Sequence, residues 1–201
     1  MHSLSLLFSL VGCATAFVLP HLATECSIDS FDIPLTEFNA SISNVAYQPA
    51  NARNVSGAFN QKGFCEVNAT IQYGTADSLD FTLWLPDWVN YEGRFLAVGN
   101  GGMAGTIDYV NMLQQFNSRL GVAVAGGNAG HLASRNNDGG GEPGVYLPYL
   151  HDPAQVEAWI HNAISLFTPA AKALTAAYYR DQPMFSYYDG AWTLNPTIGS
   201  H

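Results

Sequence analysis

The stretch "RFLAVGNGGMAGTIDYVNMLQQFNSRLGVAVAGG", residues 94–127, decides the fold. Its two ends, 94–100 and 122–127, are continuous apolar runs, which are typical of strands covered on both faces. Between them a glycine-rich turn leads into residues with apolar side chains at helical spacing: Ile107, Val110, Leu113 and Phe116. Gly121 is expected to follow the helix end. The stretch predicts strand, turn, helix and strand, the first unit of a parallel α/β sheet.

Two further strands are predicted before this unit. Residues 65–73 and 79–85 have strand composition, and "GTADS" separates them. In "LDFTLWLP" apolar and other residues alternate, which is the period of a strand with one buried face. The two segments therefore predict an antiparallel pair.

A long helix and a third buried strand are predicted after it. Asp152 and Pro153 are typical of a helix N-cap and first position. At Thr168-Pro169 the helix either kinks, or Thr168 caps a second helix that runs to Tyr179. The run "MFSYY", residues 184–188, then predicts a buried strand.

Composition limits the class of protein. The 201 residues, 48% of them hydrophobic, fit one domain with a real core. Seven Lys and Arg face sixteen Asp and Glu, a net charge of -9, and no basic block occurs. A nucleic-acid partner would need a cationic face, so the sequence argues against one. Past the first residues no apolar run approaches a membrane span, and no membrane partner is expected.

Residues 1–16 have the pattern of a signal peptide. Leu4 to Val11 is apolar, and Ala14-Thr15-Ala16 supplies the small residues of a cleavage site. The alternative is a buried N-terminal strand or helix. We expect a secreted chain that begins near Phe17.

In a secreted chain two cysteines can form a disulfide and three sequons can accept glycans. In an oxidising compartment Cys26 and Cys65 are expected to pair, closing a loop that restricts the unfolded chain by roughly 3–4 kcal/mol. Free thiols, or pairing with a cysteine of a longer product, are the alternatives. Asn39, Asn54 and Asn68 are acceptor positions for N-linked glycans.

The sequence contains few motifs of known chemistry. The sequence contains no phosphate-binding loop, no His-Glu-x-x-His, no zinc-type cysteine pairing and no Gly-x-Ser-x-Gly. No metal site is therefore expected. His131 and His161 have no visible partner in the sequence, so structural or surface roles are favoured over catalytic ones. Asp138 and Glu142 lie in "NDGGGEPG", which predicts a solvated loop rather than an acid–base pair or a cation site.

The glycine-rich turn carries the clearest functional signal. Gly99, Gly101 and Gly102 sit where a buried strand passes into a helix, so backbone N–H groups can point into a site without obstruction. Serine hydrolases of the α/β class take one oxyanion-hole N–H from such a loop. Gly101 and Gly102 are the oxyanion-hole candidates; the alternative is a tight turn that binds nothing.

The segments "LWLPDWVNYEGRFLAVGNGGMAGTIDY", "GVAVAGGNAGH", "AAKALTAAYY" and "FSYYDG", in this order, resemble the amino-terminal part of the fungal tannase and feruloyl esterase family. The resemblance runs from about Cys65 to Gly190. It implies an α/β-hydrolase fold with a large inserted lid domain, and a Ser, Asp and His that cleave small phenolic acid esters. It also implies that calcium, where relatives carry it, lies in the lid, so this chain is expected to hold no cofactor.

The chain departs from the family at one point. In relatives the motif matching "FSYYDG" continues with Cys-Ser-x-Gly-Gly, and the serine is the nucleophile. Here Ala191 follows Gly190, and Trp192 occupies the place of the serine. The catalytic Asp and His, with the lid, would lie beyond His201. We expect no catalytic residue in this chain, and the abrupt change favours a frameshift, a retained intron or an alternative transcript.

The expected architecture is thus an incomplete α/β-hydrolase-type sheet, truncated at the nucleophile-elbow strand. Residues 65–190 form the partial domain, 17–64 an irregular N-terminal segment packed on it, and 191–201 an aberrant tail. The contrasting hypothesis is a secreted non-catalytic glycoprotein that binds phenolics or cell-wall material. Its aromatic platform would consist of four tyrosines on elements expected to be buried: Tyr178, Tyr179, Tyr187 and Tyr188.

Overall fold

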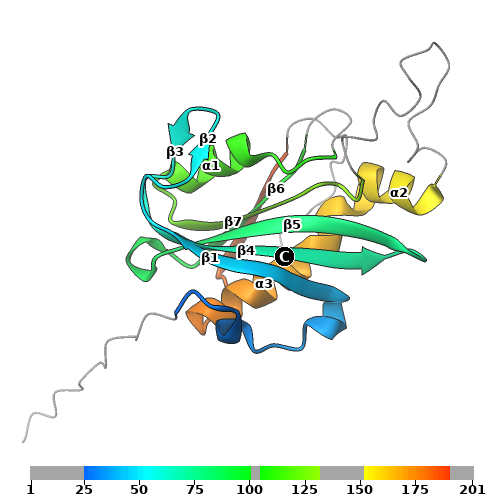
Figure 1. Ribbon diagram of the computed structural model, residues 1–201, viewed down its shortest axis with the longest axis horizontal. Coiled ribbons are helices and arrows are strands. Elements are labelled where there is room, and N and C mark those ends of the chain that lie inside the picture. The colour runs from blue at the N-terminus through cyan, green and yellow to red at the C-terminus, as the bar shows by residue number, and fades with distance from the viewer. Residues whose placement is uncertain (1–24, 101–104, 132–151, 191–201) are drawn as a thin grey trace, which may run out of the picture.

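A six-stranded mixed sheet organises the chain (Figure 1). The computed structural model describes residues 25–100, 105–131 and 152–190. The strands lie in the order β1-β4-β5-β7-β6-β8. Within it β4 (Phe64–Tyr73) and β5 (Asp77–Pro86) form the long antiparallel pair that the sequence predicts. In the described part of the chain no helix has the length and apolar character needed to cross a membrane.

The parallel part of the sheet follows the predicted strand–turn–helix–strand unit. β6 (Arg94–Val98) runs parallel to β7 (Val122–Gly127), and α1 (Tyr109–Asn117) connects them. β8 (Phe185–Asp189) lies parallel to β6 on its other side. The α/β-hydrolase-type sheet expected from the sequence is therefore present, in partial form.

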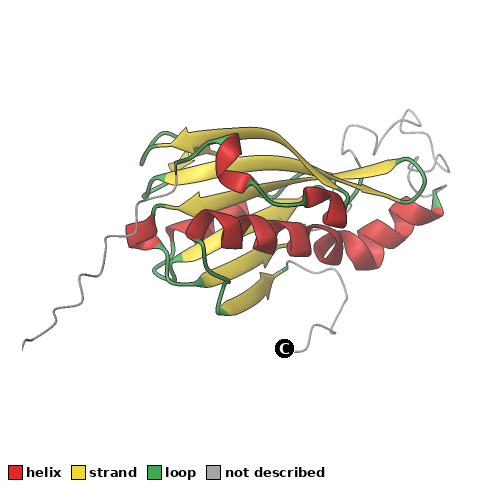
Figure 2. Cartoon of the chain, turned by 90° about the horizontal axis from the view of Figure 1, so that it is seen from below, coloured by secondary structure: helices red, strands yellow, loops and turns green. Residues whose placement is uncertain are grey.

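Helices cover both faces of the sheet. On one face α1 buries Met112, Leu113 and Phe116 against a cluster that includes Trp84 and Val98. Val110, expected on this buried side, is exposed, because Met112 is the residue that reaches the sheet. Figure 2 shows the longest helix, α3, crossing the strands on the other face. The two layers together bury all of β7 and all but the first residue of β6, and these two strands consist almost wholly of apolar residues and glycine.

The α3 helix is continuous with a shorter helix before it. Asp152 caps α2 (Pro153–Glu157) by accepting hydrogen bonds from two backbone N–H groups, as predicted. A π-helical turn, η6 (Ala158–Asn162), joins α2 to α3 (Ala163–Tyr179). Thr168 lies inside α3 and caps no second helix, and the irregular turn precedes Pro169 rather than coinciding with it.

The N-terminal segment packs on the sheet but is less irregular than expected. Two 3-10 turns, η1 (Ile28–Phe31) and η2 (Leu35–Phe38), lead into β1 (Ala40–Gln48), which pairs antiparallel with β4. The prediction of no regular structure here was wrong because the pairing shifts register between Ile42 and Asn44. Such a bulge breaks the alternation by which a strand is recognised. A two-stranded hairpin, β2 (Asn54–Val55) and β3 (Ala58–Phe59), follows.

The predicted disulfide is present. Cys26 and Cys65 are bonded, with Cα atoms 5.4 Å apart. Cys65 is fully buried in β4, so the bond ties the start of the described chain to the core strand. The two alternatives, free thiols and pairing with a cysteine of a longer product, do not agree with this bond.

Two local expectations are corrected on β5 and after α1. Trp84 and Thr82 of β5 are buried as well as its apolar face, because α1 covers the side that the alternation predicted to face water. The α1 helix ends at Asn117 with Ser118 as its cap. Gly121, with φ of +59°, turns the chain into β7 instead of ending the helix.

The strand β8 lies at the edge of the sheet and not in its interior. Among the described residues it pairs with β6 alone. Phe185, Tyr187 and Tyr188 are 53%, 46% and 40% exposed, although their composition predicted burial. A parallel strand with apolar side chains on both faces is typical of the interior of a sheet, where a strand lies on each side of it. The exposure of β8 therefore follows from its place at the edge.

Candidate active-site edge

The carboxyl ends of β7, β6 and β8 meet at one edge of the sheet. Because the three strands are parallel, Gly99 after β6 lies beside Asp189 at the end of β8. The Gly99 N–H donates a hydrogen bond of 2.9 Å to the Asp189 carbonyl oxygen. Ligands of open α/β sheets bind in the crevice at this end of the strands.

A side-chain bond ties the β8 end to α1. The Gln115 amide Nε2 donates to the Asp189 carboxylate Oδ2 over 2.6 Å. Since α1 is the helix that follows the glycine-rich turn, this bond couples the turn to the chain that enters Gly190. Sequence reasoning missed Gln115, because 74 residues separate the two partners.

The two ends of the glycine-rich turn are anchored. Asn100 Nδ2 donates to the Thr106 carbonyl oxygen (2.5 Å), and the Gly105 N–H donates to the Asn128 carbonyl oxygen (3.1 Å). A Cβ at Gly99 would lie 2.5 Å from the Tyr188 hydroxyl oxygen, so a side chain there would have to displace the Tyr188 ring. The oxyanion-hole candidates, 101 and 102, lie outside the described residues, between these two anchors.

The turn after β7 is held by one buried amide. Asn128 Oδ1 accepts the N–H groups of Asp80 and Gly130, each at 3.1 Å, and the Asn128 N–H donates to the Asp80 carbonyl oxygen at 2.9 Å. Ala129 and Gly130 then adopt φ of +64° and +84°. A buried alanine in the left-handed region is strained, and the Asn128 bonds compensate for it. A polar residue directly after the run "VAVAGG" was the available sequence signal.

His131 follows this turn and is 6% exposed. It borders a pocket of about 290 Å³ together with Asp77, Asp80 and Gln155, whose Nε2 donates to Asp77 Oδ1 over 2.8 Å. His161, in contrast, is exposed on the π-helical turn. The structural or surface roles expected for the two histidines remain a prediction.

Tyr73 closes one side of the turn after β7. Its hydroxyl donates to the Gly130 carbonyl oxygen over 2.8 Å. Burial raises the pKa of Tyr73 well above its usual value, and the nearby carboxylates of Asp77 and Asp152 raise it further. The phenol therefore stays a neutral donor at physiological pH.

Other candidates fall in the ranges that the structure leaves out. Asp138 and Glu142 of the proposed solvated loop, and Trp192, lie outside the described residues. Within the described ranges, no three His, Cys, Asp or Glu side chains come together in a way that could hold a metal ion.

A second pocket of about 540 Å³ adjoins the glycine-rich turn. Asn100 and Thr106 border it from the turn, Asp108 and Tyr109 from the start of α1, and Val55 from the β2–β3 hairpin. Sequence reasoning gave this hairpin no part in the site. Through Val55 the N-terminal segment therefore forms one side of this pocket, next to the ends of the glycine-rich turn.

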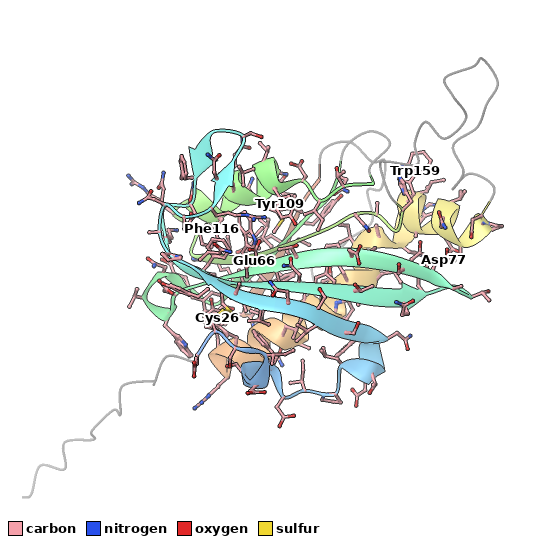
Figure 3. The ribbon with its side chains drawn as sticks, viewed as in Figure 1. Cys26, Glu66, Asp77, Tyr109, Phe116 and Trp159 are labelled. Carbon is pink, nitrogen blue, oxygen red and sulfur yellow. A yellow bond between two sulfur atoms is a disulfide. The ribbon has the colours of Figure 1, made fainter. Side chains whose placement is uncertain are left out.

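An ionic group centred on the buried Glu66 holds that side of the pocket in place. Glu66, on β4, accepts hydrogen bonds from Trp84 Nε1 (3.1 Å) and Gln48 Nε2 (2.9 Å) and pairs with Arg53 (3.3 Å). The Arg53 guanidinium also lies 5.0 Å from the centre of the Tyr109 ring. Figure 3 shows Glu66 on the sheet and Tyr109 above it, at the start of α1. The group links the sheet, the segment before β2 and the start of α1.

Comparisons with known proteins agree with this geometry. The family described as "Tannase and feruloyl esterase" matches residues 65–193. A probable feruloyl esterase B-1 of Neosartorya fischeri is 30% identical over 200 residues, which cover 92% of this chain and 35% of that protein. Feruloyl esterase C of Talaromyces stipitatus is 31% identical over 175 residues, covering 86% and 30%. The chain thus spans about a third of the length of these relatives.

Solved structures share the fold. The crystal structure of feruloyl esterase B from Aspergillus oryzae superposes with a TM-score of 0.69 at 26% identity, over 84% of this chain and 32% of that one. Tannin acyl hydrolase from Aspergillus niger, at 21% identity, has a TM-score of 0.51 over 76% and 28%, a likeness of fold. The family match covers well over half of the chain and contains every strand of its parallel edge. This chain belongs to the tannase and feruloyl esterase family.

Proposed function

We propose that residues 65–190 supply the oxyanion side of a serine carboxylic ester hydrolase that acts on small phenolic acid esters. The observation that carries this proposal is the hydrogen bond between Gly99 and Asp189. It sets the glycine-rich turn beside the point where, in the family motif, the chain turns to present its nucleophile.

The chemistry follows from that adjacency. When a serine hydroxyl attacks an ester carbonyl, negative charge develops on the carbonyl oxygen. α/β-hydrolases stabilise it with the N–H after the nucleophile and a second N–H from the loop following an early strand. The turn at Gly101 and Gly102 is the source we assign to the second N–H. The hydrogen bonds of Asn100 and Gly105 hold the two ends of this turn.

We further propose that the 201 residues alone hydrolyse no ester. Trp192 stands where the family motif has serine, and its indole offers no nucleophilic oxygen. Loss of the nucleophile leaves only the weak effects of binding and oxyanion stabilisation. Secretion is part of the proposal and rests on the signal-peptide pattern of residues 1–16.

The non-catalytic alternative finds no support in the aromatic side chains. Tyr178 and Tyr179 are buried against the sheet. Tyr187 and Tyr188 are exposed, but as neighbours on one strand they point to opposite faces. The four tyrosines therefore make no common platform for a phenolic ring.

The experiment is to incubate the purified 201-residue chain with methyl ferulate and methyl gallate. Rates at the uncatalysed background are expected. Hydrolysis that a serine-directed inhibitor abolishes would overturn the proposed inactivity. The oxyanion role is tested separately, in a chimera in which residues 26–190 replace the matching segment of feruloyl esterase C of Talaromyces stipitatus.

A further inference from the structure

The three sequons lie in different structural settings. Asn39 is exposed where η2 ends, with φ of +50°, and Asn54 is exposed at the start of the β2–β3 hairpin. The hydroxyl residues of these two sequons, Ser41 and Ser56, are also exposed. Asn68 is half-buried in β4, between β1 and β5.

Asn54 presents its sequon in a tight turn. Ser56 and Gly57 have φ of +51° and +87°, as in a two-residue hairpin turn. Asn54 Oδ1 accepts the Gly57 N–H over 2.9 Å. This bond uses the amide oxygen and leaves the amide nitrogen, the atom that receives a glycan, for the transferase.

Asn68 is engaged by the folded sheet. Its Oδ1 accepts the Thr82 hydroxyl at 2.7 Å, and Thr82, itself 1% exposed, is 3.1 Å from the Tyr109 hydroxyl on α1. The sequon hydroxyl is occupied as well, because Thr70 Oγ1 donates to Asp80 Oδ1 over 2.7 Å. As at Asn54, the bond uses the amide oxygen. Asn68, however, is half-buried between β1 and β5 and its sequon hydroxyl is bonded as well, so the folded sheet restricts access to this sequon.

We propose that Asn39 and Asn54 carry N-linked glycans and that folding of β4 excludes Asn68. The inference rests on the proposed secretion, which supplies a lipid-linked oligosaccharide diphosphate as donor. The amide nitrogen forms a bond to the anomeric carbon, the bond from that carbon to the lipid diphosphate breaks, and the amide proton passes to a base of the transferase. At Asn68 this reaction competes with pairing of β4.

The disulfide makes this competition controllable. Cys65 lies three residues before Asn68 on β4, and its bond to Cys26 fixes the strand in the core. Preventing the bond should keep β4 open for longer. Glycosylation of Asn68 should then rise, whereas Asn39 and Asn54, exposed in the folded chain, should be unaffected.

The test is translation of the full chain with endoplasmic-reticulum microsomes. Three variants each keep one sequon, the other two asparagines being replaced by Gln, and glycosidase-sensitive gel shifts report occupancy. Under oxidising conditions we expect nearly complete modification of the Asn39 and Asn54 variants and less than about a tenth for Asn68. Reductant, or Cys26→Ser, should raise the Asn68 value several-fold and leave the other two unchanged.

Each other result contradicts part of the proposal. Full modification of Asn68 under oxidising conditions would refute exclusion, and no modification of Asn39 or Asn54 would refute their assignment. If Asn68 stays unmodified after reduction, folding is not what excludes it. Replacing residues 1–16 by a proven signal peptide separates these outcomes from a failure of secretion, which would leave all three sequons unmodified only with the native leader.

Discussion

The Gly99 N–H and the Asp189 carbonyl oxygen are joined by a 2.9 Å hydrogen bond that extends the β6–β8 ladder past the end of β6. The Asp189 carboxylate is held in turn by Gln115 of α1. Strand β6, helix α1 and the end of β8 before Gly190 are therefore connected by hydrogen bonds. A displacement of β8 would move the turn that we assign to the oxyanion hole.

Gly102 is expected to be essential for turnover in the chimera with feruloyl esterase C. Gly102→Val would block close approach of the substrate oxygen to the backbone. The loss of one oxyanion donor costs about 10²–10³ in kcat. Steady-state kinetics with methyl ferulate measure the effect, and the melting temperature shows whether folding is intact. Unchanged kcat in a folded variant would remove the turn from the mechanism.

Replacing the buried Glu66 is expected to lower the free energy of unfolding more than replacing an exposed glutamate. Glu66→Gln keeps an acceptor for Trp84 but leaves the Arg53 guanidinium without its carboxylate, at a cost of about 1–3 kcal/mol. Glu92→Gln is the matched control, because its side chain is 58% exposed in the ion pair with Arg94, against 5% for Glu66. Exposed pairs contribute little to stability, because water and salt screen them.

Urea unfolding of the two variants beside the parent chain measures this difference. Equal losses of unfolding free energy in both variants would show that the Glu66 group does not hold the N-terminal segment beside the pocket at the glycine-rich turn.

Stability is expected to fall at alkaline pH because of buried tyrosines. Burial, and then the nearby Asp181 carboxylate, raise the pKa of Tyr91 to about 12. Since the folded-state pKa exceeds the value near 10 of the unfolded chain, this contribution to stability is complete below pH 10 and is lost as pH rises toward 12.

Tyr91→Phe separates this titration from packing, because the ring that stacks on Tyr179 at 3.6 Å is kept. Chemical denaturation between pH 8 and 12 should show a smaller alkaline loss for the variant than for the parent. Parallel curves would mean that Tyr91 titrates normally in the folded chain.

The elements with a strong local pattern could be predicted from the sequence. The apolar runs of β6 and β7, the alternation in β5 and the Asp152 cap each act within a few residues. β1 could not be predicted, because its bulge interrupts the period and its partner residues on β4 lie between 16 positions (Gln48 with Phe64) and 31 positions (Ala40 with Ile71) further along the chain.

The polar contacts of the site could not be predicted from the sequence either. Asn128 and Glu66 acquire their partners only when distant strands come together. The exposure of β8 depends on which strands lie beside it, a property that its own composition cannot reveal. Gly101 and Gly102 remain a prediction from motif and resemblance.

Hydrolysis of methyl ferulate by the chimera that carries residues 26–190 tests the central claim most directly, with the 201-residue chain assayed beside it. The account predicts inhibitor-sensitive hydrolysis by the chimera and background rates for the chain alone. A chimera that folds yet hydrolyses nothing, while unmodified feruloyl esterase C is active, would contradict the claim that this segment forms the oxyanion side of an esterase.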